Sequence, residues 1–186
     1  FLIFTAFVAP ATAQTAPISH YGASENAAFG KVVERIGDVD ADGTRDFAVG
    51  APYSDEVIHI PFPVFIENAG AVSIYSGVNG ELIWKVAGPL SGDTEFGFAV
   101  ADAGDVDLDG HDDVLVGLPN ANGVVPESGS VQLLSGLDGT PIRSFLGTQT
   151  DERYGESICA GHMDPDLSSA EVAIGAPHHD TGGFTG

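Results

Sequence analysis

The sequence repeats itself, and this limits the chain to architectures built from similar units that lie side by side. The stretch AFGKVVERIGDVD, Ala28 to Asp40, is matched by EFGFAVADAGDVD, Glu95 to Asp107. A third copy begins with RYGESICAGHMD, Arg153 to Asp164. Because one such unit cannot bury its apolar faces alone, the copies are expected to stack on their neighbours.

Two landmarks keep the three copies in phase. Each copy begins with an aromatic residue followed by glycine and reaches a Gly-x-Pro corner 21 residues later. The aromatic residues are Phe29, Phe96 and Tyr154, and the corners are Gly50-Ala51-Pro52, Gly117-Leu118-Pro119 and Gly175-Ala176-Pro177. The constant spacing indicates that the copies share one local fold.

Each copy is predicted to form four short strands, and no segment has sustained helical periodicity. In the first copy the strands are expected near residues 30–36, 47–50, 71–75 and 82–86. Asn79-Gly80 and Asp138-Gly139 are typical of type I′ turns, so a hairpin is expected at each. Four antiparallel strands per unit predict a β-propeller blade. The expected fold class is all-β, with two full blades and a partial third as a fragment of a larger propeller.

The start of the chain has the composition of an export signal. Phe1 to Val8 is apolar and uncharged, and Ala11-Thr12-Ala13 supplies small residues where signal peptidase prefers them. An ordinary N-terminal strand is the alternative, and the run is shorter than the roughly 20 residues of a membrane span. Because an initiator Met is missing, we expect a fragment. The expected segments are a signal remnant at 1–13, a linker at 14–21, and repeats at 22–89, 90–147 and 148–186, the last incomplete.

The phased landmarks resemble the FG-GAP repeat of integrin α-subunit propellers and of many exported bacterial proteins. The resemblance covers about residues 22–186 and rests on Phe29-Gly30, Phe96-Gly97, Tyr154-Gly155 and the Gly-x-Pro corners. Leu118 in place of Ala, and Tyr154 in place of Phe, are mild departures. The resemblance implies a β-propeller whose aspartate-rich loops hold calcium.

Two aspartate-rich loops, GDVDADGTRD from Gly37 and GDVDLDGHDD from Gly104, lie between the landmarks. Crowded carboxylates repel one another without a cation, and calcium accepts about 6–8 oxygen ligands in flexible geometry. Gly43 and Gly110 permit the sharp turn, and a backbone carbonyl is the expected next ligand by analogy with an EF-hand loop. The candidate calcium ligands are Asp38, Asp40, Asp42, the carbonyl of Thr44, and Asp46 in the first loop, and Asp105, Asp107, Asp109, the carbonyl of His111, and Asp113 in the second.

The loops admit two other interpretations. An EF-hand needs a Glu at loop position 12 and flanking helices, but that position is Val49 or Val116 within an apolar strand, so the EF-hand is rejected. Turns rich in Asp without a metal remain the alternative, because Asp favours turns.

The third copy departs from the aspartate pattern. The register set by its two landmarks brings Met163, Pro165 and Leu167 to the ligand positions. We therefore expect no calcium, or only weak binding, in this loop.

The charge of the chain excludes some partners. The sequence has 27 Asp and Glu against 6 Lys and Arg, a formal charge of −21, which repels nucleic acid and anionic lipid and attracts cations. No Gly-x-Ser-x-Gly occurs, and neither His178–Asp180 nor Cys159 with His162 forms a catalytic set, so no enzyme activity is expected. The single cysteine, Cys159, permits no internal disulfide and is expected to be buried.

The expected function is that of an exported, calcium-binding propeller segment that serves as a binding or adhesion scaffold, secreted or at the cell surface. Its partner is expected to be an extracellular protein or polysaccharide. An insert at 53–69 is a candidate partner surface; alternatively it packs over its own blade or extends a hairpin. Two other functions remain open, an accessory propeller of a secreted hydrolase whose catalytic domain lies outside this fragment, and a polysaccharide-binding module.

Overall fold

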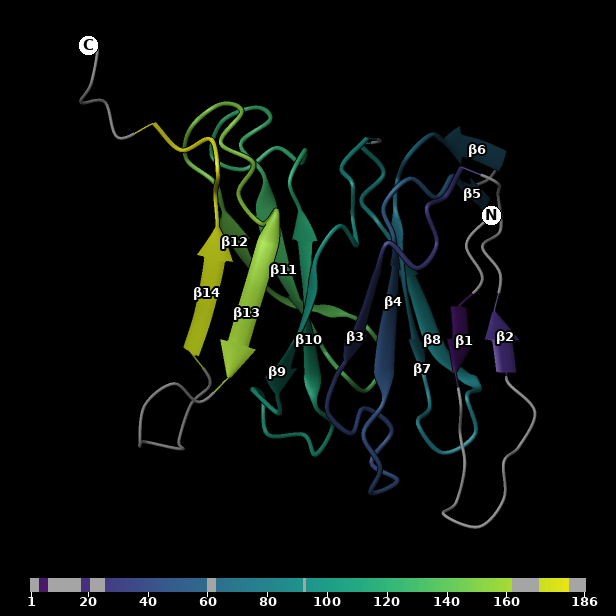
Figure 1. Ribbon diagram of the computed structural model, residues 1–186. Helices are drawn as coiled ribbons and strands as arrows, with labels where there is room; N and C mark the ends of the chain where they lie inside the picture. The colour runs from purple at the N-terminus through teal and green to yellow at the C-terminus, as the bar shows by residue number, and fades with distance from the viewer. Residues whose placement is uncertain are drawn as a thin grey trace.

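A computed structural model describes residues 4–6, 18–20, 26–59, 63–91, 93–161 and 171–180. Within these ranges the regular structure consists of antiparallel strands, and most of them form two four-stranded sheets that lie side by side (Figure 1). The expected all-β fold class, built from propeller blades, is confirmed.

Each of the first two copies forms one blade. The first contains β3 (Val32–Arg35), β4 (Phe47–Ala51), β7 (Ala71–Tyr75) and β8 (Leu82–Ala87), in the spatial order β3-β4-β7-β8. The second contains β9 (Val100–Gly104), β10 (Asp113–Leu118), β11 (Ser130–Leu134) and β12 (Pro141–Leu146), in the order β9-β10-β11-β12. The four strands predicted in the first copy match β3, β4, β7 and β8 closely.

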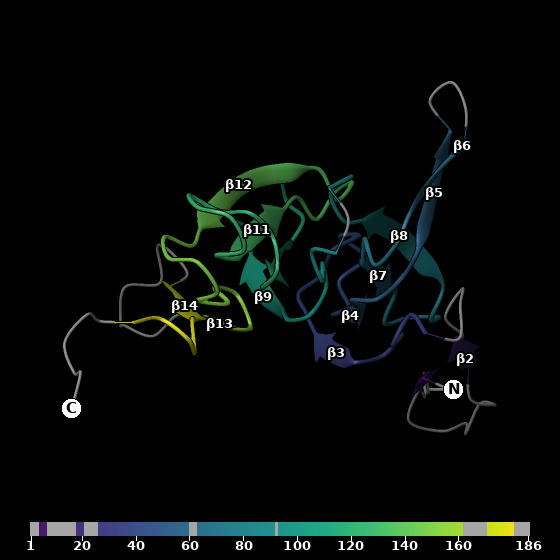
Figure 2. The same cartoon turned by 90° about the horizontal axis from the view of Figure 1, so that it is seen from above.

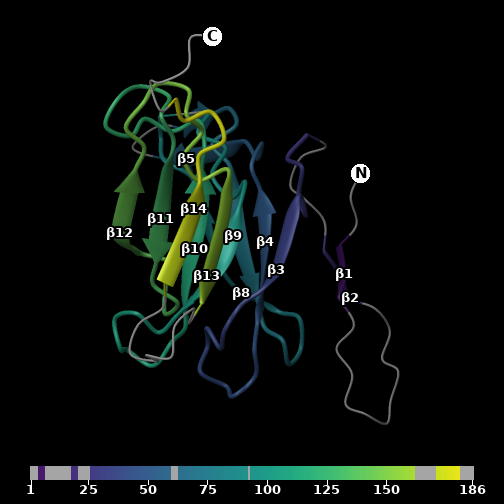
Figure 3. The ribbon, with the colours of Figure 1, turned by 60° about the vertical axis from the view of Figure 1, so that its left-hand side comes forward.

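The third copy contributes the antiparallel pair β13 (Ser157–Gly161) and β14 (Glu171–Gly175). The first strands of the three copies, β3, β9 and β13, are neighbours, while β8 and β12 lie on the other side of the arc (Figure 2). Figure 3 brings the third copy forward and shows β13 beside β9. The sheets are therefore arranged like consecutive propeller blades.

Two hairpins lie outside the blades. The insert of the first copy forms β5 (Glu56–His59) and β6 (Pro63–Ile66), which stand out from the sheet in Figure 2. An ion pair between Glu56 and Lys85 joins the base of this hairpin to β8. The insert therefore extends a hairpin, one of the two alternatives expected for it.

Near the N-terminus, β1 (Phe4–Ala6) pairs with β2 (Ile18–His20). Part of the expected signal remnant is thus a strand, and the rest of residues 1–13 lies outside the described residues. Processing by signal peptidase stays a prediction. Among the residues described, no helix is long and apolar enough to cross a membrane.

The core lies between the blades. The central strands β4 and β10 are buried almost throughout, because both faces of each are covered by protein. The largest cluster joins side chains of the first blade, such as Ile74, to side chains of the second, such as Phe96 and Val116. Packing across the joint between blades therefore supplies much of the hydrophobic stabilisation.

The landmark residues meet at this joint. Within each copy, the N–H of the glycine after the aromatic residue donates to the carbonyl of the corner glycine, at 3.0 Å for Gly30 and Gly50. A Cβ added to Gly50 would lie 2.1 Å from the carbonyl oxygen of Gly97 in the next blade, and one added to Gly117 would lie 2.1 Å from that of Gly155. Glycine is thus needed at the corner because the next blade contacts its backbone.

Two smaller expectations are wrong. A type I′ turn requires positive φ at both central residues, but at the predicted pairs only Gly80 and Gly139 have it, each with φ of 74°. The hairpins form through a longer loop, in which the N–H of Gly80 donates to the carbonyl of Ser76 at 2.8 Å. Cys159 is exposed rather than buried, because Ile158 and Ala160 take the inward positions of the alternating strand β13.

Candidate metal centre

The two aspartate-rich loops occupy equivalent places in consecutive blades. One joins β3 to β4 and the other joins β9 to β10, and both lie at the lower end of the molecule in Figure 1. In each blade these two strands pair antiparallel, so the loop is held at both ends by a strand ladder.

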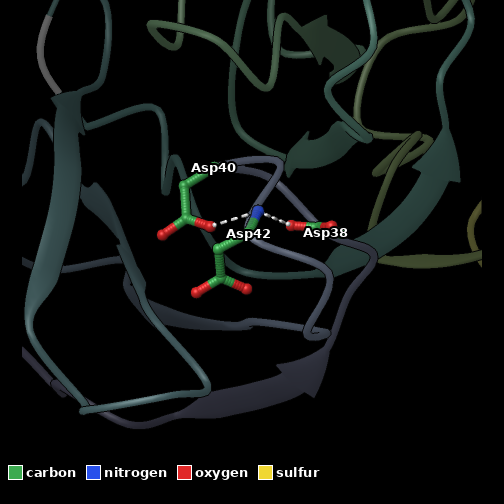
Figure 4. Close-up of side chains that lie close together, drawn as sticks. All are labelled: Asp38, Asp40 and Asp42. Carbon is green, nitrogen blue, oxygen red and sulfur yellow. Dashed lines mark hydrogen bonds between the residues drawn. The ribbon is translucent and has the colours of Figure 1, made fainter.

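The first three aspartates of each loop converge. Oxygen atoms of Asp38, Asp40 and Asp42 lie within 4.8 Å of one another, and Figure 4 shows the Asp38 and Asp40 carboxylates turned toward the N–H of Asp42. That N–H lies 3.0 Å from Asp38 Oδ1 and 3.2 Å from Asp40 Oδ1. Asp38 Oδ2 accepts a further bond from Gly43 N–H at 2.7 Å.

The second loop repeats this geometry almost atom for atom. Oxygens of Asp105, Asp107 and Asp109 also lie within 4.8 Å of one another. Asp109 N–H lies 3.0 Å from Asp105 Oδ1 and 3.2 Å from Asp107 Oδ1, and Gly110 N–H lies 3.0 Å from Asp105 Oδ2. Two different sequences thus hold three carboxylates in the same compact arrangement.

The curl of the loops depends on left-handed backbone at two positions. Ala41 and Gly43 have φ of 58° and 90°, and Leu108 and Gly110 have φ of 64° and 95°. No atom lies within 4 Å of a Cβ built on either glycine. Glycine is therefore favoured there by the backbone conformation and not by lack of space.

Asp46 and Asp113 lie outside the two clusters of three. Asp46 is 1% exposed, and its two oxygens accept N–H bonds from Val39 at 2.8 Å and from Gly77 at 2.9 Å. Asp113 is 0% exposed and accepts the equivalent bonds from Val106 and Gly136. These carboxylates fasten each loop to itself and to the turn between the third and fourth strands; whether they also close the ion cage stays a prediction.

Burial changes the acidity of these two carboxyl groups. It raises the pKa of Asp46 and of Asp113 above the ordinary aspartate value, and the backbone N–H bonds oppose this only in part. Of the six aspartates in the clusters, Asp38 and Asp105 are partly buried and the other four are exposed. The loops thus combine a buried support with carboxylates that an ion can reach.

Of the other candidate ligands, Thr44 and His111 occupy equivalent places in the two loops. Their N–H groups donate to Asp42 Oδ1 at 2.8 Å and to Asp109 Oδ1 at 2.9 Å. The expectation that their carbonyls bind calcium stays a prediction. Residues Met163, Pro165 and Leu167, expected to replace the ligands in the third copy, lie outside the described residues.

Asp112, which the sequence analysis did not single out, links the second loop to the first. Its Oδ2 accepts the N–H of Asp38 at 2.7 Å, and its own N–H donates to the Asp38 carbonyl at 3.1 Å. His111 Nδ1 lies 2.7 Å from the carbonyl of Val39. The sequence feature that distinguishes Asp112 is the doubled aspartate at the end of GDVDLDGHDD, because the first loop has Arg45-Asp46 at the same place.

The His178–Asp180 segment belongs to a separate contact. His179 bonds to Glu152, which is 1% exposed and also accepts the N–H of Thr148. Gln149 bonds to the backbone of Asp180. These bonds tie the segment after the third corner to the connection between the second and third copies.

The comparisons with known proteins agree with this architecture. Residues 36–75, which contain the first aspartate loop with β4 and β7, match the family model described as FG-GAP repeat. The chain therefore contains a segment that matches the FG-GAP repeat, in the place where the sequence landmarks resemble that repeat.

Similar proteins include integrin α-subunits. The chain is 34% identical over 93 residues to integrin alpha-6 of Gallus gallus, a match that covers 48% of the chain and 8% of that protein. It is 34% identical over 108 residues to integrin alpha ina-1 of Caenorhabditis elegans, covering 50% of the chain and 8% of that protein. It is 31% identical over 103 residues to integrin alpha-5 of Xenopus laevis, a match that covers 52% of the chain and 9% of that protein. The matched part of the chain spans less than a tenth of the length of each of these relatives.

The residues of the two loops fit a hard divalent cation. All six converging side chains supply carboxylate oxygens, the donor type that calcium prefers, and contain none of the soft sulfur donors that select zinc or copper. Three carboxylates with oxygens within 4.8 Å also carry a concentrated negative charge, which a bound cation would neutralise. Carboxylate oxygens suit calcium and magnesium alike, so the donor set indicates a hard divalent cation.

Proposed function

We propose that this chain is an exported segment of a β-propeller whose blades are stabilised by calcium and which serves as a scaffold for binding an extracellular partner. The observation that carries the proposal is the duplicate geometry of the aspartate loops, with three converging carboxylates at the same position in two blades. The repeat boundaries at 22–89, 90–147 and 148–186, and removal of residues 1–13 on export, belong to the same proposal.

Calcium would be held by Asp38, Asp40, Asp42 and Asp46 with the carbonyl of Thr44, and by Asp105, Asp107, Asp109 and Asp113 with the carbonyl of His111. The ion would supply charge neutralisation at the base of the blades. The position of each loop is set by the protein itself, because Asp46 and Asp113 accept N–H bonds from the hairpin turn of their own blade. We propose a structural role for the ion and no enzymatic reaction for this chain.

The expected stabilisation is modest. Extracellular calcium modules bind with dissociation constants of roughly 10⁻⁴–10⁻³ M. At about 1 mM free calcium, linkage gives on the order of 0.4–1.4 kcal/mol per site. Two sites would make the chain more stable outside the cell than in a compartment with little calcium.

The test is a calcium titration of the whole chain by calorimetry, after treatment with a chelator. A matched variant with Asp40→Asn, Asp42→Asn, Asp107→Asn and Asp109→Asn keeps an oxygen acceptor at every position and removes four charges. Binding by the parent chain that is lost in the variant supports the proposal. Equal heats for both proteins would overturn it.

A second candidate function, polysaccharide binding, is favoured by a polar cavity at the opposite end of the blades from the loops. It has a volume of about 410 Å³ and is lined by residues before β9, between β10 and β11, and after β12, among them Asp93, Asn120, Asn122, Glu127 and Asp151. Amide and carboxylate groups suit a ligand rich in hydroxyls. The test is a glycan array probed with the parent chain and with the double variant Asn120→Ala, Asn122→Ala. Glycan binding that is equally strong for the double variant and the parent argues against this function.

A further inference from the structure

The two ion loops contact each other through Asp112. Its side chain accepts the N–H of Asp38 while its own N–H donates to the carbonyl of the same residue. Asp112 therefore holds both sides of the backbone at the first ligand position of the neighbouring loop. His111 adds a third contact, from Nδ1 to the carbonyl of Val39 at 2.7 Å.

The first loop is shaped to receive this contact. A Cβ built on Gly37 would lie 1.9 Å from Asp112 Oδ2, so the glycine before Asp38 leaves the space that the carboxylate occupies. In the first loop, the place of Asp112 is taken by Arg45, which pairs instead with Asp102 on β9 at 3.2 Å. Residues at the same loop position thus bridge the joint from both sides.

A short path of hydrogen bonds connects the candidate ligands of one loop to those of the other. Asp109 Oδ1 accepts the N–H of His111, and the next residue, Asp112, bonds to Asp38. An ion in the second loop would fix Asp109 and so restrict the segment that positions Asp38. Because this segment is then already ordered, the first loop loses less conformational entropy when it binds its own ion.

We propose that Asp112 is a positioning residue that couples the two loops, so that an ion in the second loop raises the calcium affinity of the first. This inference rests on the proposed calcium binding. Coupling between sites is typically about 5-fold or more in affinity, and it is reciprocal.

The test measures the calcium affinity of one loop while the other is disabled. Asp107→Asn with Asp109→Asn removes charge from the second loop and keeps the oxygens that accept the N–H groups of Asp109 and His111. We expect the first loop to bind calcium about 5-fold more weakly in this background. Disabling the first loop with Asp40→Asn and Asp42→Asn should weaken the second by the same factor.

Two substitutions of Asp112 identify the route. Asp112→Ala should lower the affinity of the first loop and make it independent of the state of the second. Asp112→Asn keeps an acceptor for Asp38 and should retain most of the coupling, which a general loss of stability would not reproduce. Equal loss of coupling in both variants overturns the hydrogen-bond route.

Hydrogen exchange supplies a readout that does not depend on the heats of binding. In calcium, amides of residues 38–44 should exchange faster in the variant with Asp107→Asn and Asp109→Asn than in the parent chain. If both loops bind calcium with affinities that do not depend on each other, the coupling is wrong and the proposed function stands. If neither loop binds calcium, the proposed function itself fails.

Discussion

Asp46 and Asp113 are the most buried aspartates of the two loops, and each accepts two backbone N–H bonds. The aspartates at the first, third and fifth loop positions are more exposed, and their oxygens converge. Aspartate therefore has two roles within nine residues of each loop. The buried one holds the loop through backbone hydrogen bonds, and the other three are candidate ligands. The support operates without an ion, because its partners are backbone groups of the same blade.

Replacing the buried support should destabilise the fold even without calcium. Asp46→Ala leaves the N–H groups of Val39 and Gly77 without their acceptor, at an expected cost of about 1–3 kcal/mol. The control is Asp40→Ala at an exposed position, where a change within about 0.5 kcal/mol is expected. Urea unfolding in chelator measures both. Equal stability of the two variants would contradict the supporting role of Asp46.

Glu152 should make stability depend on pH in the acid range. Burial alone would raise its pKa, but the bond from His179 and the N–H groups of Thr148 and Gln149 outweigh burial and lower the pKa below the ordinary value of 4.5. Because the folded state then binds the proton less tightly than the unfolded chain, the stabilisation is complete above that ordinary value. It is lost as the pH falls through the lowered pKa of the folded state.

The measurement is the melting temperature between pH 2 and pH 7. The parent chain should lose stability on acidification below about pH 4.5 more steeply than Glu152→Gln. The exposed Glu34→Gln is the control and should follow the parent. Parallel curves for Glu152→Gln and the parent would rule out this contribution.

Among the elements, the strand ends carry the contacts between blades. The corner glycine near the end of β4 or β10 lies against the backbone of the next copy. Trp84 on β8 donates from Nε1 to the carbonyl of Gly136 in the second blade at 2.7 Å. Phasing of the landmarks in the sequence therefore reflects a contact repeated at each joint.

Filling the space at a corner should weaken the joint between copies. Gly117→Ala brings a Cβ within 2.1 Å of the Gly155 carbonyl, so backbone must move, at an expected cost of about 1–3 kcal/mol. Val78→Ala, at a half-exposed site on a turn, is the control and should change stability by about 0.5 kcal/mol or less. Denaturant unfolding followed by the fluorescence of Trp84 measures the difference; no destabilisation by Gly117→Ala would show that the corner tolerates a side chain.

The strands of the first two copies could be predicted from the sequence because alternation, apolar runs and repeated landmarks all pointed to the same segments. The convergence of Asp38, Asp40 and Asp42 followed from their alternate spacing. The role of Asp112 could not be predicted, because it depends on how two blades pack. The prediction of a type I′ turn at Asn79-Gly80 was wrong because the loop contains more residues than a two-residue hairpin. The prediction that Cys159 is buried was wrong because the register of β13 decides which face of the sheet the side chain occupies.

At the scale of the whole molecule, the two ends of the blades differ. The aspartate loops gather at one end (Figure 1), and a polar cavity lies at the other. A chain with a formal charge of −21 concentrates cations near its surface. Binding of ions at one end would rigidify the blades while leaving the opposite end free for a partner.

Calcium should raise the melting temperature of the chain. Two sites at about 0.4–1.4 kcal/mol each, with roughly 2–4 °C per kcal/mol for a chain of this size, give an increase of several degrees at about 1 mM calcium. Magnesium at the same concentration should give less, because it dehydrates reluctantly and demands octahedral geometry. Equal melting temperatures in calcium and in chelator would contradict a stabilising ion.

The most direct test of the account is the number of calcium ions bound by the chelator-treated chain, measured by calorimetry. The account predicts two ions per chain, falling to one when either Asp40 and Asp42 or Asp107 and Asp109 are changed to Asn. A chain that binds no calcium, or that still binds two ions after both pairs are changed, would contradict it.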